Sequence, residues 1–186
     1  MGGIKMTFEE ETYELNGKTI TLRGPRKEDA AMLIDWLKTV CDETPFLLQY
    51  GDEVKLTTEQ EEEFLEKRND SDSGLMILAF VDGKFAGNCS FDKAGNSRRA
   101  RHIADIGIAL LQEYTGQGLG RFMLTRLLER IKSDGYEQAN LIVIEGNDRA
   151  KHLYESLGFV ETGRIPKANK YDDGTYRDDI LMSNPL

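Results

Sequence analysis

The segment at residues 114–121, Tyr-Thr-Gly-Gln-Gly-Leu-Gly-Arg, limits what this chain can fold into more than any other. It follows an apolar, strand-like stretch and precedes apolar residues at helical spacing, so it should join a strand to a helix. Backbone N–H groups at a helix start lack acceptors, and the helix dipole is positive there. Gly116, Gly118 and Gly120 let the backbone approach an anion, and Arg121 adds a cation. The segment therefore predicts an anion-binding loop, with a plain glycine-rich turn as the alternative.

Glycine-rich loops between a strand and a helix also occur in proteins that bind dinucleotides or nucleoside triphosphates. Counting from Gly116, the third position of the dinucleotide fingerprint falls on Arg121, and the tight first turn is missing. The loop also lacks the Gly-Lys-Ser/Thr of a triphosphatase. Glu145 does end the next expected strand, as a ribose-binding acid would. A nucleotide-dependent oxidoreductase is therefore an alternative, although antiparallel strands before the loop leave no room for two βαβαβ halves.

The remaining segments predict an α/β fold with a mixed, mostly antiparallel central sheet and flanking helices. Asn16 and Gly17 lie between two strand-like segments and predict a hairpin with a two-residue turn. Two further strands should surround Asp173 and Gly174, and residues 41–57 should be irregular. Other expected elements are helices at 28–40, 58–68, 119–134 and 147–157, and strands at 75–81, 85–91, 101–111 and 139–144. With 186 residues, a single domain over 1–186 is expected.

The composition limits which binding partners and which cellular compartment are expected. The formal net charge is −9 and no long block of Lys or Arg occurs, which argues against nucleic-acid binding and permits an amine substrate. The longest apolar run, residues 75–81, is too short to span a membrane. Cys41 and Cys89 are far apart and lack Cys or His neighbours at ligand spacing. We therefore expect no metal site, and buried thiols in a cytoplasmic protein.

Three segments carry a resemblance to a known family. They are Ile-Gly-Ile-Ala-Leu at 106–110, Gly-Leu-Gly at 118–120 and Asn-Asp-Arg-Ala-Lys-His-Leu-Tyr-Glu-Ser-Leu-Gly-Phe at 147–159. Residues 101–182, which include them, resemble the GCN5-related N-acetyltransferases, the GNAT family. The resemblance implies the GNAT-like acyl-CoA N-acyltransferase fold, acetyl-coenzyme A as co-substrate, and direct acetyl transfer to an amine of a small molecule or peptide. A homodimer is expected, and a non-catalytic protein that senses coenzyme A is a second alternative.

By this resemblance, the pantetheine arm binds backbone groups of Ile108, Ala109 and Leu110 at a bulge that splays two strands. The pyrophosphate is held by the loop residues Gly116, Gln117, Gly118, Leu119, Gly120 and Arg121. Asn147 should cap the following helix and also hydrogen-bond the pantetheine arm.

Three side chains near the expected phosphate site are not firmly expected to contact the phosphate. The family usually has Arg or Gln where this chain has Thr115, so the contact from that side chain is not expected. Arg149 and Lys151 could reach a phosphate, but charges on a short exposed helix are more often solvated.

Acyl transfer to an amine needs an unprotonated nitrogen and a proton for the leaving thiolate. Tyr154 matches the family position that protonates the thiolate, although its place on an apolar helical stripe also suits core packing. The family's frequent strand Glu is replaced by Ile142. Asp105 is therefore the candidate base, directly or through water, and Glu145 is second. No metal and no covalent Cys intermediate are expected.

The acceptor wall is expected from two segments whose sequence varies freely in this fold. They are residues 41–57 and the last hairpin, residues 164–179. Four carboxylates in that hairpin hint at a cationic acceptor, although solubility is the plainer explanation: Asp172, Asp173, Asp178 and Asp179.

Overall fold

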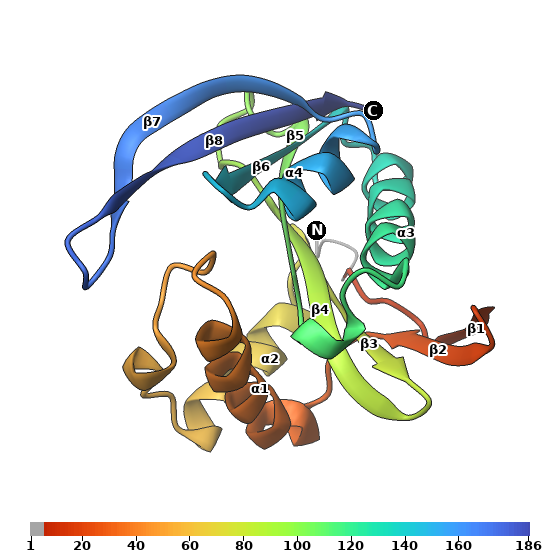
Figure 1. Ribbon diagram of the computed structural model, residues 1–186. Coiled ribbons are helices and arrows are strands. Elements are labelled where there is room, and N and C mark those ends of the chain that lie inside the picture. Colours follow the sequence, from red (N-terminus) through yellow and green to blue (C-terminus); the bar gives the residue numbers. More distant parts are fainter. Residues whose placement is uncertain (1–5) are drawn as a thin grey trace.

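The computed structural model, described for residues 6–186, is built on one eight-stranded sheet (Figure 1). The strands lie in the order β1-β2-β3-β4-β5-β6-β8-β7. Their bounds are β1 (Glu11–Leu15), β2 (Lys18–Arg23), β3 (Gly74–Val81), β4 (Lys84–Lys93), β5 (Ile103–Leu110), β6 (Gln138–Ile144), β7 (Val160–Lys170) and β8 (Tyr176–Pro185). Within this sheet β5 and β6 are parallel and every other pair is antiparallel. The predicted mixed, mostly antiparallel sheet is confirmed, and the single parallel pair rules out a dinucleotide-binding fold.

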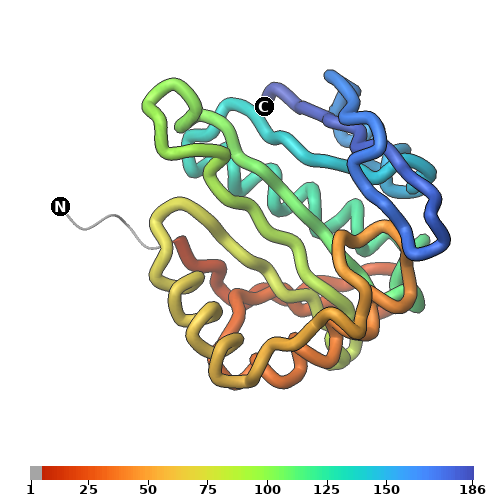
Figure 2. Tube along the Cα trace, turned by 90° about the vertical axis from the view of Figure 1, so that its left-hand side faces the viewer, coloured from red at the N-terminus to blue at the C-terminus, as the bar shows by residue number. Residues whose placement is uncertain are grey.

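Helices cover both faces of the sheet, α1 and α2 on one side and α3 with α4 on the other (Figures 1 and 2). They are α1 (Ala30–Glu43), α2 (Thr58–Asn69), α3 (Leu119–Ser133) and α4 (Asp148–Glu155), with short 3-10 turns at η1 (Lys27–Asp29), η2 (Gly51–Glu53) and η3 (Gln112–Tyr114). The larger core lies under α3 and includes Tyr154 of α4, while a smaller core lies under α1 and α2. No helix in the described residues is long and apolar enough to cross a membrane.

Local sequence signals account for the ends of several elements. Asn16 and Gly17 have φ angles of 54° and 75°, the positive values that the predicted two-residue hairpin turn requires. Thr57 and Gln60 form a reciprocal capping box that starts α2. The single crossover β5–α3–β6 is present as predicted.

The predicted end of α1 was wrong, because the helix continues to Glu43 and only then becomes irregular. Cys41 continues the apolar stripe and packs with Ile34 and Val54 in a small cluster. This burial gives the helix another turn, which the expected irregular stretch from residue 41 did not include.

The sheet splits between β5 and β6. These strands pair only at Ile103–Gln138, Ala104–Ala139 and Asp105–Asn140, and they separate beyond that point. Pairing between β5 and β4 continues without a shift of register, so the bulge expected in β5 is not there. The register shift lies one strand away, between β3 and β4.

Gly87 on β4 makes the close approach of β5 possible. It has a φ of 148°. A β-carbon at this position would overlap the carbonyl oxygen of Ala109 and lie 2.8 Å from Cα of Leu110. A glycine inside a strand pattern can signal such a close backbone approach.

Candidate active site

The glycine-rich loop presents a row of free amides beside the split. Gly116 and Gly118 have φ angles of 73° and 88°, and Gly118 is the N-cap of α3. Within residues 6–186, the six backbone N–H groups from Gly116 to Arg121 have no hydrogen-bond acceptor, and the first paired amide is that of Phe122, which donates to the Gly118 carbonyl at 3.0 Å. Six amides and the positive end of a helix dipole together form a site for an anion.

Gly120 has a packing role that the sequence did not indicate. A β-carbon there would lie 3.4 Å from Cδ2 of Leu153 and 3.5 Å from Cδ1 of Leu110. The predicted opening of the backbone toward a ligand therefore applies to Gly116 and Gly118, whereas Gly120 lets α3 approach β5 and α4. Leu119 is 2% exposed, so only its backbone can face a ligand.

The β1–β2 hairpin holds the loop from outside. The Asn16 side-chain amide donates to the Gln117 carbonyl at 2.9 Å, and the Lys18 ammonium donates to the Gln117 side chain at 2.9 Å. The side chain of Gln117 is thus engaged with protein, and its backbone amide remains free. The contact joins segments about a hundred residues apart, and no local pattern predicts it.

Arg149 places a cation beside Thr115, the position at which the family usually has Arg or Gln. Its guanidinium donates to Oγ1 of Thr115 at 2.6 Å, at the start of the loop. Arg121 points to α4 instead, and donates to Oγ of Ser156 at 2.6 Å. Lys151 lies away from the loop, paired with Glu161 at 2.8 Å. Of the two α4 cations that could have reached a phosphate, the structure places Arg149 at the loop and Lys151 elsewhere.

Backbone groups of β5 line the gap on one side. The Leu111 amide donates to the Ala86 carbonyl at 2.9 Å, and bonding residues alternate along an antiparallel pair. The backbone of Ala109 is therefore turned to β4, while Ile108 and Leu110 turn theirs toward β6, which has already separated. This alternation narrows the predicted pantetheine contacts to Ile108 and Leu110.

Asn147 stands at the other side of the gap, where β6 leads into α4. Its side-chain oxygen accepts a hydrogen bond from the Ala150 amide at 3.3 Å, so the predicted helix cap is confirmed. Its predicted contact with the pantetheine arm stays a prediction.

Tyr154 is buried but keeps an unpaired hydroxyl. The side chain is 8% exposed, and its ring meets Phe159 edge-on at 6.0 Å between centroids. No residue from 6 to 186 bonds its hydroxyl, yet that oxygen is not among the fully enclosed unpaired atoms of this range, which are Nε1 of Trp36 and Nε of Arg68 and Arg126. Burial raises the pKa of Tyr154 to about 12, which keeps the hydroxyl protonated at neutral pH. The ring packs in the core, and the hydroxyl is available as a donor.

Asp105 lies at the last residue pair before the strands separate. It follows Ala104, which is fully buried under α3, so its own side chain points to the opposite face of the sheet from Tyr154. Burial raises the pKa of Asp105 above its ordinary value, a hydrogen bond from Asn140 opposes this, and the charge of Asp92 adds to it.

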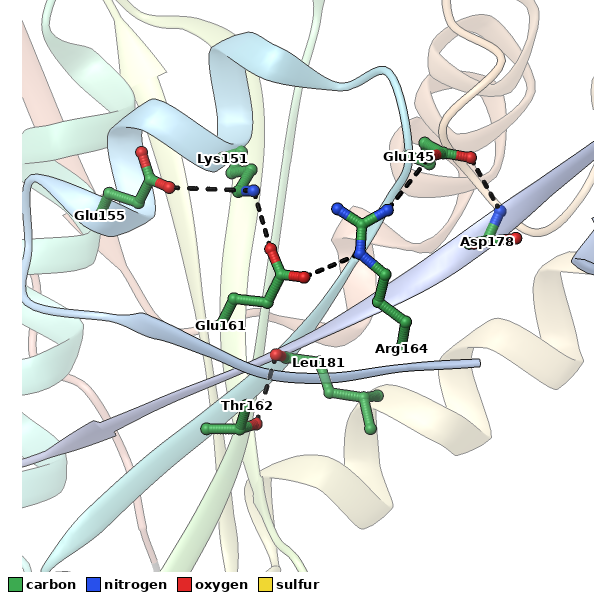
Figure 3. Close-up of polar contacts among 8 residues, drawn as sticks. All are labelled: Glu145, Lys151, Glu155, Glu161, Thr162, Arg164, Asp178 and Leu181. Atoms are coloured by element: carbon green, nitrogen blue, oxygen red, sulfur yellow. Dashed lines mark hydrogen bonds and ion pairs between the residues drawn. The ribbon is translucent and has the colours of Figure 1, made fainter. Parts of the chain in front are cut away.

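Glu145, the second candidate base, belongs to a network of ion pairs (Figure 3). Arg164 bridges Glu145 at 3.1 Å and Glu161 at 2.7 Å, and Lys151 pairs with Glu161 at 2.8 Å. The two cations lower the pKa of Glu161 to about 2. The network connects α4, β7 and the end of β6. Glu145 is therefore already paired, which makes it the weaker candidate.

The structure brings together the two segments expected to form the acceptor wall (Figure 2). The Tyr171 hydroxyl donates to the Pro45 carbonyl at 2.8 Å, and the Asp172 amide donates to the Tyr50 hydroxyl at 3.1 Å. The loop after α1 and the β7–β8 hairpin thus meet across the open face of the split sheet.

Three of the four hairpin carboxylates hold the hairpin itself. Asp178 accepts from the Lys167 amide at 2.8 Å, Asp179 from the Asn169 side chain at 2.7 Å, and Asp173 from the Thr175 amide at 2.8 Å. These bonds give the three carboxylates a structural role that does not depend on the charge of an acceptor. No group of three or more potential metal ligands occurs among residues 6–186.

Comparison with known proteins decides the family. The model of the acetyltransferase (GNAT) family matches residues 32–159, well beyond the C-terminal half that carried the resemblance. The chain belongs to the GNAT acetyltransferase family. A GNAT-family acetyltransferase from Streptococcus pneumoniae is 34% identical, with 90% of this chain and 99% of that chain covered and a TM-score of 0.83. The enzyme class predicted from the sequence, an acetyl-coenzyme A-dependent N-acetyltransferase, is the class of this family.

Other similar proteins include one solved structure of the same fold and two curated enzymes whose names give different acceptors. Salmonella typhimurium yncA, solved with its cofactor acetyl-coenzyme A, has the same fold at 22% identity and a TM-score of 0.78, over 90% of this chain and 94% of that chain. The Escherichia coli L-amino acid N-acyltransferase MnaT is 29% identical over 50% of this chain and 54% of its own length. The Escherichia coli ribosomal protein bS18-alanine N-acetyltransferase is 37% identical over 44% and 54%. The chain spans about half the length of these curated relatives.

Proposed function

We propose that this GNAT-family chain transfers the acetyl group of acetyl-coenzyme A to an amine of a small molecule or a peptide by direct attack in a ternary complex. The six free amides at Gly116 to Arg121, next to the split between β5 and β6, carry this proposal. They suit a pyrophosphate, and the free backbone of Ile108 and Leu110 suits an amide-bearing arm in the gap. The curated relatives act on amino acids and on the alanine of a ribosomal protein, which supports an amine acceptor.

In this proposal the proton donor and the proton acceptor lie on opposite faces of the split sheet. Bound acetyl-coenzyme A supplies the thioester carbon that the amine nitrogen attacks and the thiolate that leaves. Tyr154, on the α4 face, holds the proton that passes to the sulfur as the carbon–sulfur bond breaks. Asp105, on the opposite face, takes the proton that the amine loses, directly or through one water. No group on the protein is acetylated along this route.

Initial rates of thiol release test the proposal when the concentrations of acetyl-coenzyme A and the amine are varied together. We expect intersecting reciprocal plots, because both substrates must be bound before transfer. Parallel plots would indicate an acetylated enzyme and contradict direct attack. The amines to screen are polyamines, amino acids, aminoglycosides and peptides with free N-termini. Acetyl-coenzyme A binding without thiol release on any of them would favour the non-catalytic coenzyme A sensor.

Arg149→Ala is expected to weaken acetyl-coenzyme A binding about tenfold, the effect of losing one charge-assisted contact at the loop. Its guanidinium lies against Thr115, at the entrance to the row of free amides. Lys151→Ala is the matched control on the same helix, because Lys151 is held by Glu161. Isothermal titration calorimetry should show a normal dissociation constant for the control. Equal losses in both variants would mean that general charge, and not position, attracts the cofactor.

Asp105→Asn is expected to lower turnover mainly at low pH, where the amine is protonated and needs a base. Because burial raises the pKa of Asp105, the wild-type rate should itself decline as pH falls through that raised value. At high pH the free amine forms unaided, and the two rates should converge. The measurement is the pH profile of turnover for both proteins. Parallel profiles would assign proton removal to another group or to bulk water.

We further propose that the enzyme is cytoplasmic and forms a homodimer. Cys41 and Cys89 are buried and unbridged, as suits a reducing compartment. Ile142 on β6 and Val160 on β7 are 57% and 58% exposed, and such apolar side chains on an uncovered sheet suit contact with a second copy. Light scattering in solution measures the molecular mass, and a mass of one chain at micromolar concentration would contradict the dimer.

A further inference from the structure

Arg177 on β8 lies between two aromatic rings that come from different segments. Its guanidinium carbon is 5.0 Å from the ring centre of Phe46, in the loop after α1, and 5.0 Å from that of Tyr171, in the β7–β8 turn. These cation–π contacts hold the flat guanidinium in one place. Arg177 therefore stands where both segments of the acceptor wall meet.

The charge of Arg177 has no counter-ion in direct contact. Within residues 6–186 its half-buried side chain donates no hydrogen bond and has no carboxylate within 4.0 Å. Asp173 is near enough for Arg177 to help lower its pKa, but its oxygen is bonded to Thr175. Five N–H donors in a fixed fork thus remain for a ligand. Arg177 therefore places an unpaired positive charge beside the carboxylates of this wall.

The position of Arg177 determines the distance between a group bound to its guanidinium and the split between β5 and β6. A β-carbon on Gly146, the residue before Asn147, would lie 3.4 Å from Nη1 of Arg177, which places the guanidinium at the open end of the gap. Along β8, Arg177 is four residues from Leu181. Leu181 pairs with Ile142 of β6, near the point where β6 separates from β5. At about 3.4 Å per residue, the separation of Arg177 from Leu181 is roughly 14 Å.

We propose that Arg177 binds a carboxylate of the acceptor, and that the acceptor is an extended amine such as a short peptide; this inference rests on the proposed acetyltransferase function. A guanidinium binds a carboxylate through two parallel hydrogen bonds, and a guanidinium already held by two rings loses little freedom in doing so. A free α-amino acid carries its carboxylate two bonds from the nitrogen and cannot span the distance. A tripeptide acetylated at its N-terminus can span it with its C-terminal carboxylate.

The test uses trialanine, trialanine C-terminal amide and free alanine as acceptors, with the same enzyme preparations. For the wild type we expect kcat/KM for trialanine to exceed that for its amide about tenfold, through KM, and free alanine to be the poorest of the three. Arg177→Gln should bring the ratio of acid to amide close to one. Arg177→Lys keeps the charge without the fork and should retain part of the preference.

A purely structural role for Arg177 would change both peptides equally, because the neutral amide is an internal control for folding. An acid-to-amide ratio near one in the wild type would overturn the inference, as would a preference that survives Arg177→Gln. Acetylation of polyamines or free alanine in preference to trialanine would also overturn it. Absence of thiol release with every amine would instead remove the proposed function, so the two failures are distinct. Melting curves of the variants with acetyl-coenzyme A identify any that do not fold, and Arg177→Lys then carries the test.

Discussion

Tyr154→Phe is expected to lower turnover about a hundredfold or more, the usual contribution of a general acid, while acetyl-coenzyme A affinity changes little. The change keeps the ring and its edge-on contact with Phe159, and it removes a hydroxyl that no residue from 6 to 186 bonds. Stability should therefore survive, since no buried partner is left unpaired. With its pKa raised to about 12, the hydroxyl is protonated throughout the neutral range and can donate to the leaving thiolate.

Steady-state thiol release on the best amine, together with melting curves with and without acetyl-coenzyme A, makes the comparison. If Tyr154 only packs in the core, the variant should instead keep near-normal turnover, because the ring and its packing remain. A loss of less than about threefold, with chemistry limiting the rate, would remove Tyr154 from the mechanism.

Gly87→Ala is expected to lower the free energy of unfolding by about 3 kcal/mol. At a φ of 148° an alanine is strained, and its β-carbon would collide with the backbone of Ala109 and Leu110. Neither neighbour is the flexible end of a side chain, so β5 itself must shift. Because β5 offers the backbone of Ile108 to the gap, acetyl-coenzyme A affinity should fall as well.

Urea unfolding measures the stability change, with Gly107→Ala on β5 as the control. Gly107 has nothing within 4 Å of its would-be β-carbon, so its replacement should cost less than about 1 kcal/mol. Comparable losses for both glycines would show that the close approach at Gly87 is not the cause.

Features set by a few neighbouring residues were predictable from the sequence. The hairpin at Asn16 and Gly17 depends on backbone angles that these two residues adopt readily, and Asn147 caps its helix through a residue three positions on. The crossover around α3 was predictable because the spacing of apolar residues changes from every second residue to about every three and a half residues. In each case the deciding interactions lie within one or two elements.

Contacts between distant segments decided the rest, and no local pattern reports them. The packing role of Gly120 could not be predicted, because its partners on β5 and α4 lie outside the loop sequence. In the sequence, Arg149 cannot be distinguished from any other exposed charge on a helix, and only the fold shows that it contacts Thr115. No local pattern indicates a role for Arg177, since Phe46 lies more than a hundred residues earlier in the chain.

The proposed activity depends on one interaction, the binding of the acetyl-coenzyme A pyrophosphate by the free amides at Gly116 to Arg121. Melting temperatures measured at matched ligand concentrations test it most directly, with acetyl-coenzyme A, S-acetylpantetheine, NAD and ATP as the four ligands. A ligand at a hundred times its dissociation constant stabilises the folded protein by about 2.7 kcal/mol, which a melting curve detects easily. We predict a large shift for acetyl-coenzyme A, and much smaller shifts for NAD and ATP, which lack the pantetheine arm, and for S-acetylpantetheine, which lacks the pyrophosphate. Equal shifts for acetyl-coenzyme A, NAD and ATP, or a full shift with S-acetylpantetheine, would contradict binding of the pyrophosphate by these amides.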